Sequence, residues 1–350
     1  MRDRTGEKHA ARRRRWTSAS LLLALVALAA ALAPVALAAK FAPINQAGPK
    51  LAVPRADLKA SLACTDGVEN ATRKPVLLLP ATAVDSEQNF GFNYERAFAA
   101  EDIPYCTSNQ QGELSTNMDD IQTRGEYVTY AIRKMHRLAG RRIATLGHSQ
   151  GGMITRWSLR FWPGTRRMVD DVIGMAGSNH GSSGGETTCG GGCSAAFRQQ
   201  GAGSNFIAAL NSRRETFKRI SYTEIYTRND QVVTPPESAG VGGPGKITNV
   251  AIQEICPADP EEHLAIGTSD ATAYALVIDA LGHKGPADPQ AIDPAVCAEP
   301  YMPGIDPATF LADTGESLAF LLNSIASYPK VDAEPPLRCY VRSSCKNEKN

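Results

Sequence analysis

Residues 143–153, IATLGHSQGGM, decide the fold, because a short apolar run leads there into one serine with only small or polar neighbours nearby. The Gly-x-Ser-x-Gly pattern around Ser149 is typical of a nucleophile elbow, a tight strand-to-helix turn that presents a serine hydroxyl. The chain holds 30 glycines, and a second stretch, Gly181-Ser182-Ser183-Gly184-Gly185, matches the same pattern. The flanking sequence has to decide between the two serines.

The flanks favour Ser149. Residues 142–146 form a short β-prone run, and residues 153–162 place apolar side chains at helical spacing until Pro163-Gly164 ends the pattern. The stretch after Ser183 reads GGETTCGGGC, and each glycine costs a helix about 1 kcal/mol. The sequence therefore predicts an elbow at Ser149 and a loop around Ser183.

Residues 1–38 are predicted to be a secretory signal peptide. Four arginines, residues 12–15, precede an apolar stretch, residues 19–33, and Ala36-Leu37-Ala38 offers a small-x-small cleavage site. The apolar stretch is shorter than the about 20 residues that span a membrane. A retained N-terminal anchor is the alternative, and the arginines are compatible with either Sec or twin-arginine export. We expect an extracellular protein consisting of residues 39–350.

The chain after residue 38 is expected to be one domain without a surface for nucleic acid. The whole chain has a net charge of +1, and residues 1–38 contribute about +5 of it, so the remainder carries about +1 − 5 = −4. No basic face remains that would favour nucleic acid. No linker long enough to separate two domains interrupts the sequence.

All eight cysteines lie after residue 38, and an even number in an exported chain indicates disulfides. The close pair Cys189 and Cys193 also allows a zinc site, but no second pair with zinc-finger spacing accompanies it. The sequence therefore predicts no metal site. The disulfide candidates are Cys64, Cys106, Cys189, Cys193, Cys256, Cys297, Cys339 and Cys345.

Strand and helix patterns alternate along the chain, which predicts an α/β fold with a mostly parallel, doubly wound sheet. We expect strands at 75–79, 103–107, 142–146, 171–175, 221–227 and 247–253. We expect helices at 126–139, 153–162, 271–281 and 306–327. Residues 40–74 show no long periodic segment, and the Pro-rich stretch 284–304 is expected to wrap around the surface.

A serine nucleophile needs a base and a carboxylate that orients the base, and in this class of fold the carboxylate comes first along the chain. Asp230 follows the strand expected at 221–227, and sites in open α/β sheets form where strands end. The alternative is an Asx turn, in which Asp230 bonds its own backbone. Asp170 and Asp171 are less suitable, because they open a strand.

His263 is the candidate base, since it lies in a loop between the strand at 247–253 and the helix at 271–281. A solvated loop histidine is the alternative. His283 has a structural role at a helix C-terminus, where the dipole favours a cation. His148 is fixed beside the serine, and His180 is expected to line the rim of the site or to hold a loop.

The oxyanion of an acyl-transfer reaction needs hydrogen-bond donors that are in place before the charge develops. One donor is expected from the backbone N–H of Gln150, the residue after the serine. The second is expected from the turn after the first core strand, where Thr82 offers its N–H and its hydroxyl. The alternative is that Thr82 only caps the helix that follows.

Three segments now resemble a known family: VLLLPATA (76–83), TLGHSQGGMITRWSLRFWPGTRRMVDDVIGMA (145–176) and YTRNDQVVTPPES (226–238). Together with a Cys-bracketed loop that holds His263, they are similar to the Candida antarctica lipase B family of α/β-hydrolases. The resemblance runs from about Cys64 to about Cys345. It implies a secreted triacylglycerol lipase or carboxylesterase without a cofactor.

Residue by residue, the resemblance implies that Ser149 is the nucleophile, Asp230 the acid and His263 the base. It carries the oxyanion hole to Thr82 and Gln150. It also implies three disulfides: Cys64–Cys106, Cys256–Cys297 and Cys339–Cys345.

The sequence departs from the family at three places. The family's Pro-Gly-Thr-Gly turn is here Pro80-Ala81-Thr82-Ala83, so its backbone is expected to avoid the positive φ angles that glycine tolerates. His148 replaces a tryptophan beside the nucleophile and is expected to reshape the pocket for the alcohol part of an ester. The Gly-rich stretch 181–192 has no counterpart and is either a flap or, as we favour, a surface loop.

The sequence therefore predicts a secreted serine ester hydrolase of α/β-hydrolase fold that acts on ester or lipid substrates without cofactor or metal. A lipid–water interface is a possible site of action, and a monomer is expected. An acyltransferase or a polyester hydrolase with the same triad is the alternative. A non-catalytic surface protein that retains the fold is a third interpretation.

Overall fold

The structure is a computed structural model that describes residues 40–110, 116–184, 189 and 192–345. The predicted signal peptide, residues 1–38, lies outside these residues. A seven-stranded sheet with the order β1-β3-β2-β4-β5-β6-β7 forms the centre, and only β1 runs antiparallel to its neighbour. The strands are β1 (Leu62–Cys64), β2 (Val76–Leu79), β3 (Tyr105–Ser108), β4 (Ile143–His148), β5 (Val169–Met175), β6 (Ser221–Tyr226) and β7 (Lys246–Ala251).

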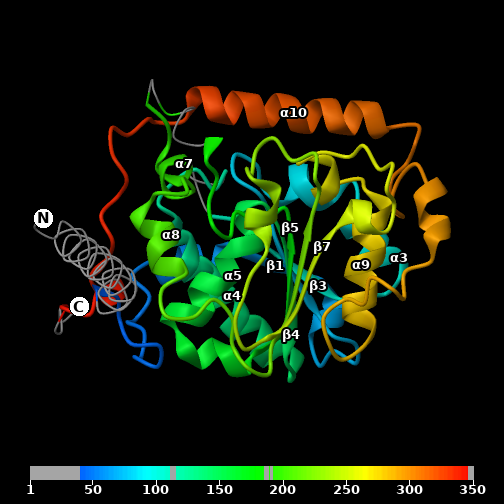
Figure 1. Ribbon diagram of the computed structural model, residues 1–350. Coiled ribbons are helices and arrows are strands. Elements are labelled where there is room, and N and C mark those ends of the chain that lie inside the picture. The colour runs from blue at the N-terminus through cyan, green and yellow to red at the C-terminus, as the bar shows by residue number, and fades with distance from the viewer. Residues whose placement is uncertain (1–39, 111–115, 185–188, 190–191, 346–350) are drawn as a thin grey trace, which may run out of the picture.

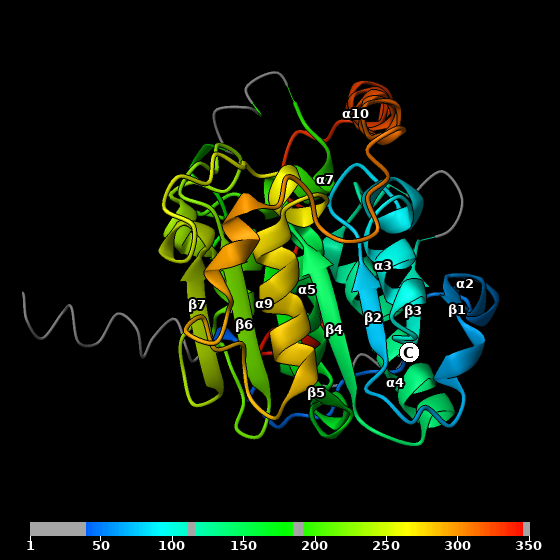
Figure 2. The ribbon, with the colours of Figure 1, turned by 90° about the vertical axis from the view of Figure 1, so that its right-hand side faces the viewer.

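Helices cover both faces of the sheet (Figures 1 and 2). The α-helices are α2 (Arg55–Ala60), α3 (Tyr94–Ala100), α4 (Ile121–Ala139), α5 (Gln150–Phe161), α7 (Ala195–Gln199), α8 (Asn205–Leu210), α9 (Ala271–Gly282) and α10 (Phe310–Ser327). Residues of α4, α5 and α8 share one buried cluster with one side of the strands, and residues of α3 and α9 share the other. This is the predicted doubly wound arrangement.

The two clusters explain why the central strands are apolar along their whole length. Leu77 and Leu79 of β2 point into the cluster of α4 and α5, whereas Val76 and Leu78 point into the cluster of α3 and α9. All four side chains are fully buried. A strand with helices on both faces has no polar side, so its sequence reads as a continuous apolar run.

The predicted elements differ from the observed ones mainly at their ends. The helix expected at 126–139 begins at Ile121, after Asp120 caps it by accepting from the N–H of Gln122. It ends at Ala139, and Gly140 is its C-cap with φ 65°. The strand expected at 247–253 ends at Ala251, and a short 3₁₀ turn follows. Strand β1 was not predicted, because it has three residues and an exposed burial pattern typical of a sheet edge.

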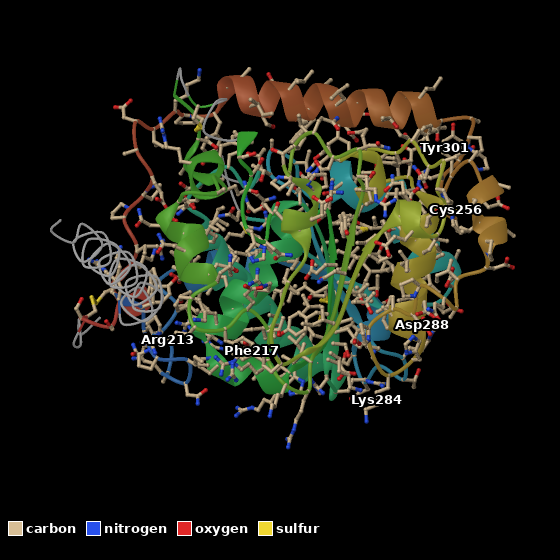
Figure 3. All side chains as sticks on the ribbon, viewed as in Figure 1. Arg213, Phe217, Cys256, Lys284, Asp288 and Tyr301 are labelled. Carbon is tan, nitrogen blue, oxygen red and sulfur yellow. A yellow bond between two sulfur atoms is a disulfide. The ribbon has the colours of Figure 1, made fainter. Side chains whose placement is uncertain are left out.

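Four disulfides bridge all eight cysteines: Cys64–Cys106, Cys189–Cys193, Cys256–Cys297 and Cys339–Cys345. Three of these pairs are those that the resemblance implies. Cys64 and Cys106 are register partners on the antiparallel pair β1 and β3. Figure 3 shows Cys256 and Tyr301 near one end of α9 and Lys284 near the other.

Helix α10 crosses one end of the molecule (Figure 1) and contacts the short helical turn Glu87–Gly91, where Ser317 donates to the carbonyl of Gln88 at 3.0 Å. Only Ser324 of this helix is buried. Four large apolar side chains of α10 are exposed: Leu311, Leu318, Leu322 and Ile325. Within the part of the chain that the structure describes, no helix is both long and apolar enough to cross a membrane.

Candidate active site

Ser149 stands on a sharp turn between β4 and α5. Its backbone has φ 54° and ψ −118°, a conformation that costs a non-glycine residue of order 1–3 kcal/mol and is common at functional sites. Two glycines make the turn possible. A Cβ on Gly147 would overlap the carbonyl of Gly151, and one on Gly151 would overlap the carbonyl of Leu79. The strand, turn and helix are those predicted for an elbow.

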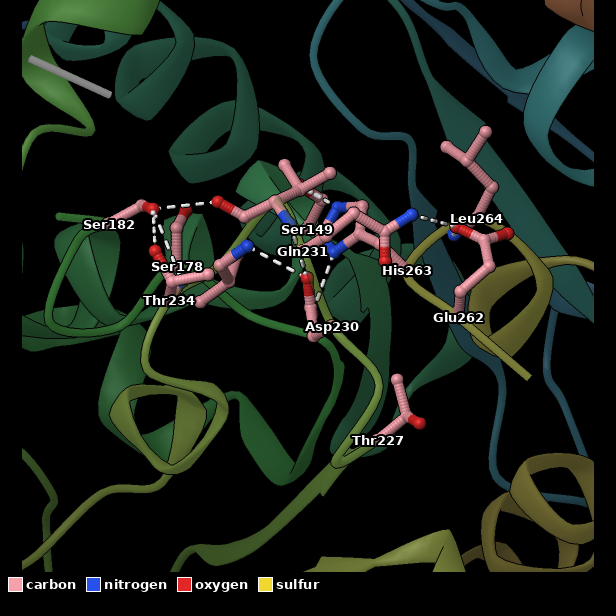
Figure 4. Close-up of polar contacts among 12 residues, drawn as sticks. Ser149, Ser178, Ser182, Thr227, Asp230, Gln231, Thr234, Glu262, His263 and Leu264 are labelled. Atoms are coloured by element: carbon pink, nitrogen blue, oxygen red, sulfur yellow. Dashed lines mark hydrogen bonds and ion pairs between the residues drawn. The ribbon is translucent and has the colours of Figure 1, made fainter. Parts of the chain in front are cut away.

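The elbow brings Ser149 into contact with His263 and Asp230 (Figure 4). The Oγ of Ser149 lies 3.1 Å from Nε2 of His263, and Nδ1 of the same ring lies 2.8 Å from Oδ2 of Asp230. All three residues are buried, with 6%, 3% and 5% of their surface exposed. A serine, an imidazole and a carboxylate in this order form a path for moving a proton from the hydroxyl to the imidazole.

Asp230 uses its two carboxylate oxygens for different purposes. Oδ1 accepts from the backbone N–H groups of Val232 and Val233, each at 2.8 Å, which is the Asx-type turn weighed as an alternative. Oδ2 bonds His263. The two interpretations are therefore compatible, because the turn fixes the carboxylate that faces the imidazole.

The loop that carries His263 is tied to the body of the protein at several points. Thr227, which follows β6, donates its hydroxyl to the carbonyl of Glu261 at 2.6 Å. Nε2 of His148 lies 2.8 Å from the carbonyl of His263 itself. The Cys256–Cys297 disulfide closes the segment that contains this loop. These contacts hold the imidazole in place before any substrate binds.

His148 is neutral, because its burial and, to a smaller extent, the nearby His263 together lower its pKa to about 3. A carbonyl oxygen only accepts, so Nε2 of His148 carries the hydrogen and donates to His263. The ring is 2% exposed. It therefore contacts His263 directly and exposes almost no surface of its own.

The remaining candidates have structural partners. Ser183 lies in a turn and bonds only Thr234, at 3.1 Å to its carbonyl and 3.0 Å to its hydroxyl, among the described residues. His180 holds a loop, since its ring nitrogens lie 2.9 Å from the carbonyl of Ser238 and 3.3 Å from Glu215. His283 pairs with Asp279 at 2.9 Å, one helical turn before it.

Asp170 and Asp171 lie at the opposite end of the sheet from the elbow, at the start of β5. Both pair with Lys74, and Asp170 also pairs with Arg142 at 2.7 Å. These ion pairs give the two carboxylates a structural role. The prediction that a strand-closing aspartate is the better partner for the imidazole agrees with this placement.

The turn 80–83 leaves one backbone N–H without a partner among the described residues. The N–H of Ala81 donates to Oδ1 of Asn89 at 2.8 Å, and that of Ala83 donates to the carbonyl of Thr116 at 2.7 Å. Between them, the N–H of Thr82 has no acceptor among residues 40–110, 116–184 and 192–345. Gln150 is the first residue of α5, so its N–H also lacks an intrahelical partner.

The hydroxyl of Thr82 accepts two side-chain hydrogen bonds, from Nε2 of Gln150 at 3.0 Å and from Nε2 of Gln200 at 2.9 Å. It caps no helix among the described residues, so that alternative is not observed.

The expectation that the turn 80–83 avoids positive φ is wrong, because Ala83 has φ 70°. An alanine there costs roughly 1–2 kcal/mol. The bond from the Ala83 N–H and two bonds from the Asn117 amide, to the carbonyls of Ala81 and Val84, fix the turn. These bonds offset the strain, and a glycine is not required.

Among the residues that the structure describes, no cluster of three or more His, Cys, Asp or Glu side chains is arranged to hold a metal ion. The Gly-rich stretch 181–192 lies partly outside the described residues. At its end, Cys189 and Cys193 form a disulfide, and Cys193 forms a bridge with Val331. The zinc alternative for this pair is therefore wrong.

Sequence reasoning missed three polar residues around the site: Asn89, Arg124 and Gln200. Asn89 bonds the Ala81 N–H, Gln200 bonds Thr82, and Arg124 bonds Gln150. An arginine on a polar helix position and a glutamine just after a short helix carry no motif. Only their contacts with the turn 80–83 and with Gln150 reveal them.

Comparisons with known proteins bear on the same region. A family model described as lipase (class 2) matches residues 74–273, a range that contains Thr82, Ser149, Gln150, Asp230 and His263. The chain is 26% identical to lipase B of Pseudozyma antarctica over 197 residues, which is 54% of this chain and 55% of that protein. It thus spans about half the length of the curated relative that it matches.

A solved structure covers more of the molecule. The crystal structure of Aspergillus fumigatus lipase B is similar with a TM-score of 0.77 and 28% identity, covering 85% of this chain and 74% of that chain. With the sheet order and the elbow, this similarity identifies the α/β-hydrolase fold.

Proposed function

Because the chain belongs to the class 2 lipase family, we propose that it is an exported carboxylic ester hydrolase whose nucleophile is Ser149. The observation that carries the proposal is the continuous contact from Ser149 through His263 to Asp230, at 3.1 Å and 2.8 Å. The activity of the relatives named lipase B supports the same class of substrate. Four disulfides support export to an oxidising compartment.

The reaction has two halves. Ser149 Oγ attacks the ester carbonyl carbon while Nε2 of His263 takes the hydroxyl proton, and the carbonyl oxygen becomes an oxyanion. The C–O bond to the alcohol then breaks, and His263 gives its proton to the leaving alcohol. Water, deprotonated by His263, attacks the acyl-enzyme, and the acid leaves as Ser149 regains its proton. Asp230 orients the ring and stabilises its positive charge in both halves.

The oxyanion is held by the N–H groups of Thr82 and Gln150 and by the Thr82 hydroxyl. All three donors are free of other acceptors in the described chain, and they are rigid before the charge develops, which is the requirement for electrostatic stabilisation. The oxyanion therefore gains hydrogen bonds that the ground-state carbonyl makes less well.

The substrate is an ester with an apolar acyl part, and a lipid surface is the proposed site of action. The four exposed apolar side chains of α10, Leu311, Leu318, Leu322 and Ile325, support this, since α10 crosses the end of the molecule where the strands end (Figure 1). An exposed apolar row of this kind commonly marks an interaction surface.

The test is hydrolysis of nitrophenyl esters from two to eighteen acyl carbons, soluble and emulsified, by wild type and by Ser149→Ala. We expect wild-type activity, loss of at least about 10³-fold in the variant, and labelling of Ser149 by a fluorophosphonate. Ser183→Ala is the matched control and should behave as wild type. Labelling at Ser183, or activity that survives Ser149→Ala, would refute the proposal.

A further inference from the structure

Arg124 is an unusual residue, because its guanidinium is buried and pairs with no carboxylate of the described residues. It lies on α4 with 2% of its surface exposed. Nη1 donates to Oε1 of Gln150 at 2.7 Å, and Nη2 donates to the carbonyl of Pro80 at 2.6 Å. No carboxylate in the described chain forms an ion pair with it. Burial lowers its pKa to about 9, so the group stays positively charged at neutral pH.

The orientation of the Gln150 side chain follows from its neighbours. A guanidinium only donates, so the amide oxygen of Gln150 faces Arg124. The amide nitrogen faces the carbonyl of Asn117 at 3.0 Å, which only accepts, and the hydroxyl oxygen of Thr82 at 3.0 Å. The Gln150 side chain therefore accepts a hydrogen bond from Arg124 and donates one to Thr82.

Gln200 constrains the same hydroxyl from the other side. Its Nε2 lies 3.2 Å from the carbonyl of Ala196, which fixes the amide, and 2.9 Å from Oγ1 of Thr82. Its Oε1 accepts from Ser178 at 2.9 Å. With two N–H donors on its oxygen, the Thr82 hydroxyl has to point its own hydrogen elsewhere. No acceptor for that hydrogen is present among the described residues.

We propose that Arg124 is a positioning residue of the oxyanion hole, which acts on the substrate through the chain Arg124–Gln150–Thr82. Each bond in this chain is donated in one direction, from the guanidinium to the amide and from the amide to the hydroxyl. Hydrogen bonds in such a chain polarise one another, so the charge of Arg124 makes the Thr82 hydroxyl a stronger donor. The second bond of Arg124, to Pro80, holds the turn that carries Thr82.

The proposal rests on the proposed function, and it explains why the charge of Arg124 is buried near the turn 80–83. An uncompensated charge in a protein interior is costly. Its field is most useful where a negative charge develops transiently, and the tetrahedral oxyanion on Ser149 is such a charge. A substrate in its ground state is neutral and gains little from the same field. Arg124 should therefore act on the transition state and leave ground-state binding nearly unchanged.

The experiment compares two inhibitors in wild type and Arg124→Gln. A trifluoromethyl ketone is attacked by Ser149 Oγ, whose proton passes to His263, and its carbonyl oxygen becomes an oxyanion. The corresponding methylene compound, which has no carbonyl, reports ground-state binding. We expect the variant to lose about 10- to 100-fold in kcat and in affinity for the ketone. Affinity for the methylene compound and KM should change by less than about threefold.

Arg160→Gln is the matched control. Arg160 lies on α5, is equally buried, and donates to the carbonyls of Ala42 and Ser212 at 2.6 and 3.2 Å, away from the turn 80–83. It should lower thermal stability without changing the ratio of the two inhibitor affinities. A purely structural role for Arg124 predicts the same for Arg124→Gln, and that outcome would overturn the proposal.

A double-mutant cycle with Thr82→Val tests the chain itself. The Arg124→Gln loss should shrink to a few-fold when the hydroxyl is absent, and losses that multiply would contradict a chain through Thr82. If Arg124→Gln does not fold, Gln150→Met cuts the chain at its middle and should give the same selective loss, so an unchanged ratio there is equally decisive. Failure of the proposed function is distinct, because wild type would then hydrolyse no ester, or Ser149→Ala would retain the activity.

Discussion

The Cys256–Cys297 disulfide is predicted to stabilise the fold by about 4 kcal/mol. The two cysteines are 41 residues apart in the sequence, and closing a loop of that length removes about 13 cal/mol/K from the unfolded chain, or about 4 kcal/mol at 25 °C. For a domain of roughly 300 residues this corresponds to a Tm lower by about 6 °C in Cys256→Ser/Cys297→Ser. Reversible urea unfolding and calorimetry of the double variant measure both quantities.

The matched control is Cys64→Ser/Cys106→Ser, which opens a loop of nearly the same length, 42 residues, far from His263 in the sequence. Its stability loss should also be about 4 kcal/mol. Removing Cys189–Cys193, with a separation of 4, should cost less than half as much. The reasoning is refuted if this short bridge contributes as much as either long one.

Of the two long-bridge variants, only Cys256→Ser/Cys297→Ser should also lose activity when it is assayed at a temperature well below its Tm. Its bridge closes the segment that holds His263, and acyl transfer is sensitive to displacements of about 1 Å. The loss should stay within about tenfold, because bonds from His148 and Thr227 still hold the loop. Equal kcat in both long-bridge variants would show that the bridge contributes nothing to the position of the base.

Two further predictions concern buried carboxyl groups. Asp230→Asn should lower kcat by about 10⁴-fold, because the imidazole loses its orienting partner. Asp171→Asn removes the ion pair with Lys74, so it should lower stability and leave kcat within about twofold. The reverse pattern would show that Asp230 is not the carboxylate that orients the imidazole. Burial raises the pKa of Glu224 from 4.5 to about 8, so the stability from its bound proton is complete below about pH 4.5 and is lost as the pH rises through 8. In Glu224→Gln, the free energy of unfolding measured with urea should fall less steeply between pH 5 and 8, with a slope smaller by up to about 1.4 kcal/mol per pH unit. An unchanged slope would mean that the buried carboxyl is ionised.

The parts of the site that the sequence predicts are those fixed by local rules. Ser149 is recognisable because its turn forbids a side chain at Gly147 and Gly151, and this restriction is visible in five consecutive residues. Asp230 follows from the period-two pattern of the strand before it. Both are consequences of neighbouring residues, so one sequence is enough.

The parts that the sequence does not predict depend on contacts between distant segments. Arg124 and Gln150 are 26 residues apart, and Gln200 and Thr82 are 118 residues apart. A helix position with a charged residue is usually solvated, and only the packing of α4 against α5 buries Arg124. The positive φ of Ala83 is hidden for the same reason, because Thr116 and Asn117 hold that turn from another part of the chain.

The pattern of satisfied and free polar groups links this packing to function. A buried N–H without a partner costs roughly 1–3 kcal/mol, so most buried donors in a fold are bonded. Around the turn 80–83 the amide oxygen of Asn89 and the amide nitrogens of Asn117 and Gln200 are each bonded. The Thr82 N–H and hydroxyl hydrogen are left free in the described chain, beside the elbow. The surrounding bonds keep these donors from reaching any other acceptor, which is the condition under which they stabilise an oxyanion without first having to reorganise.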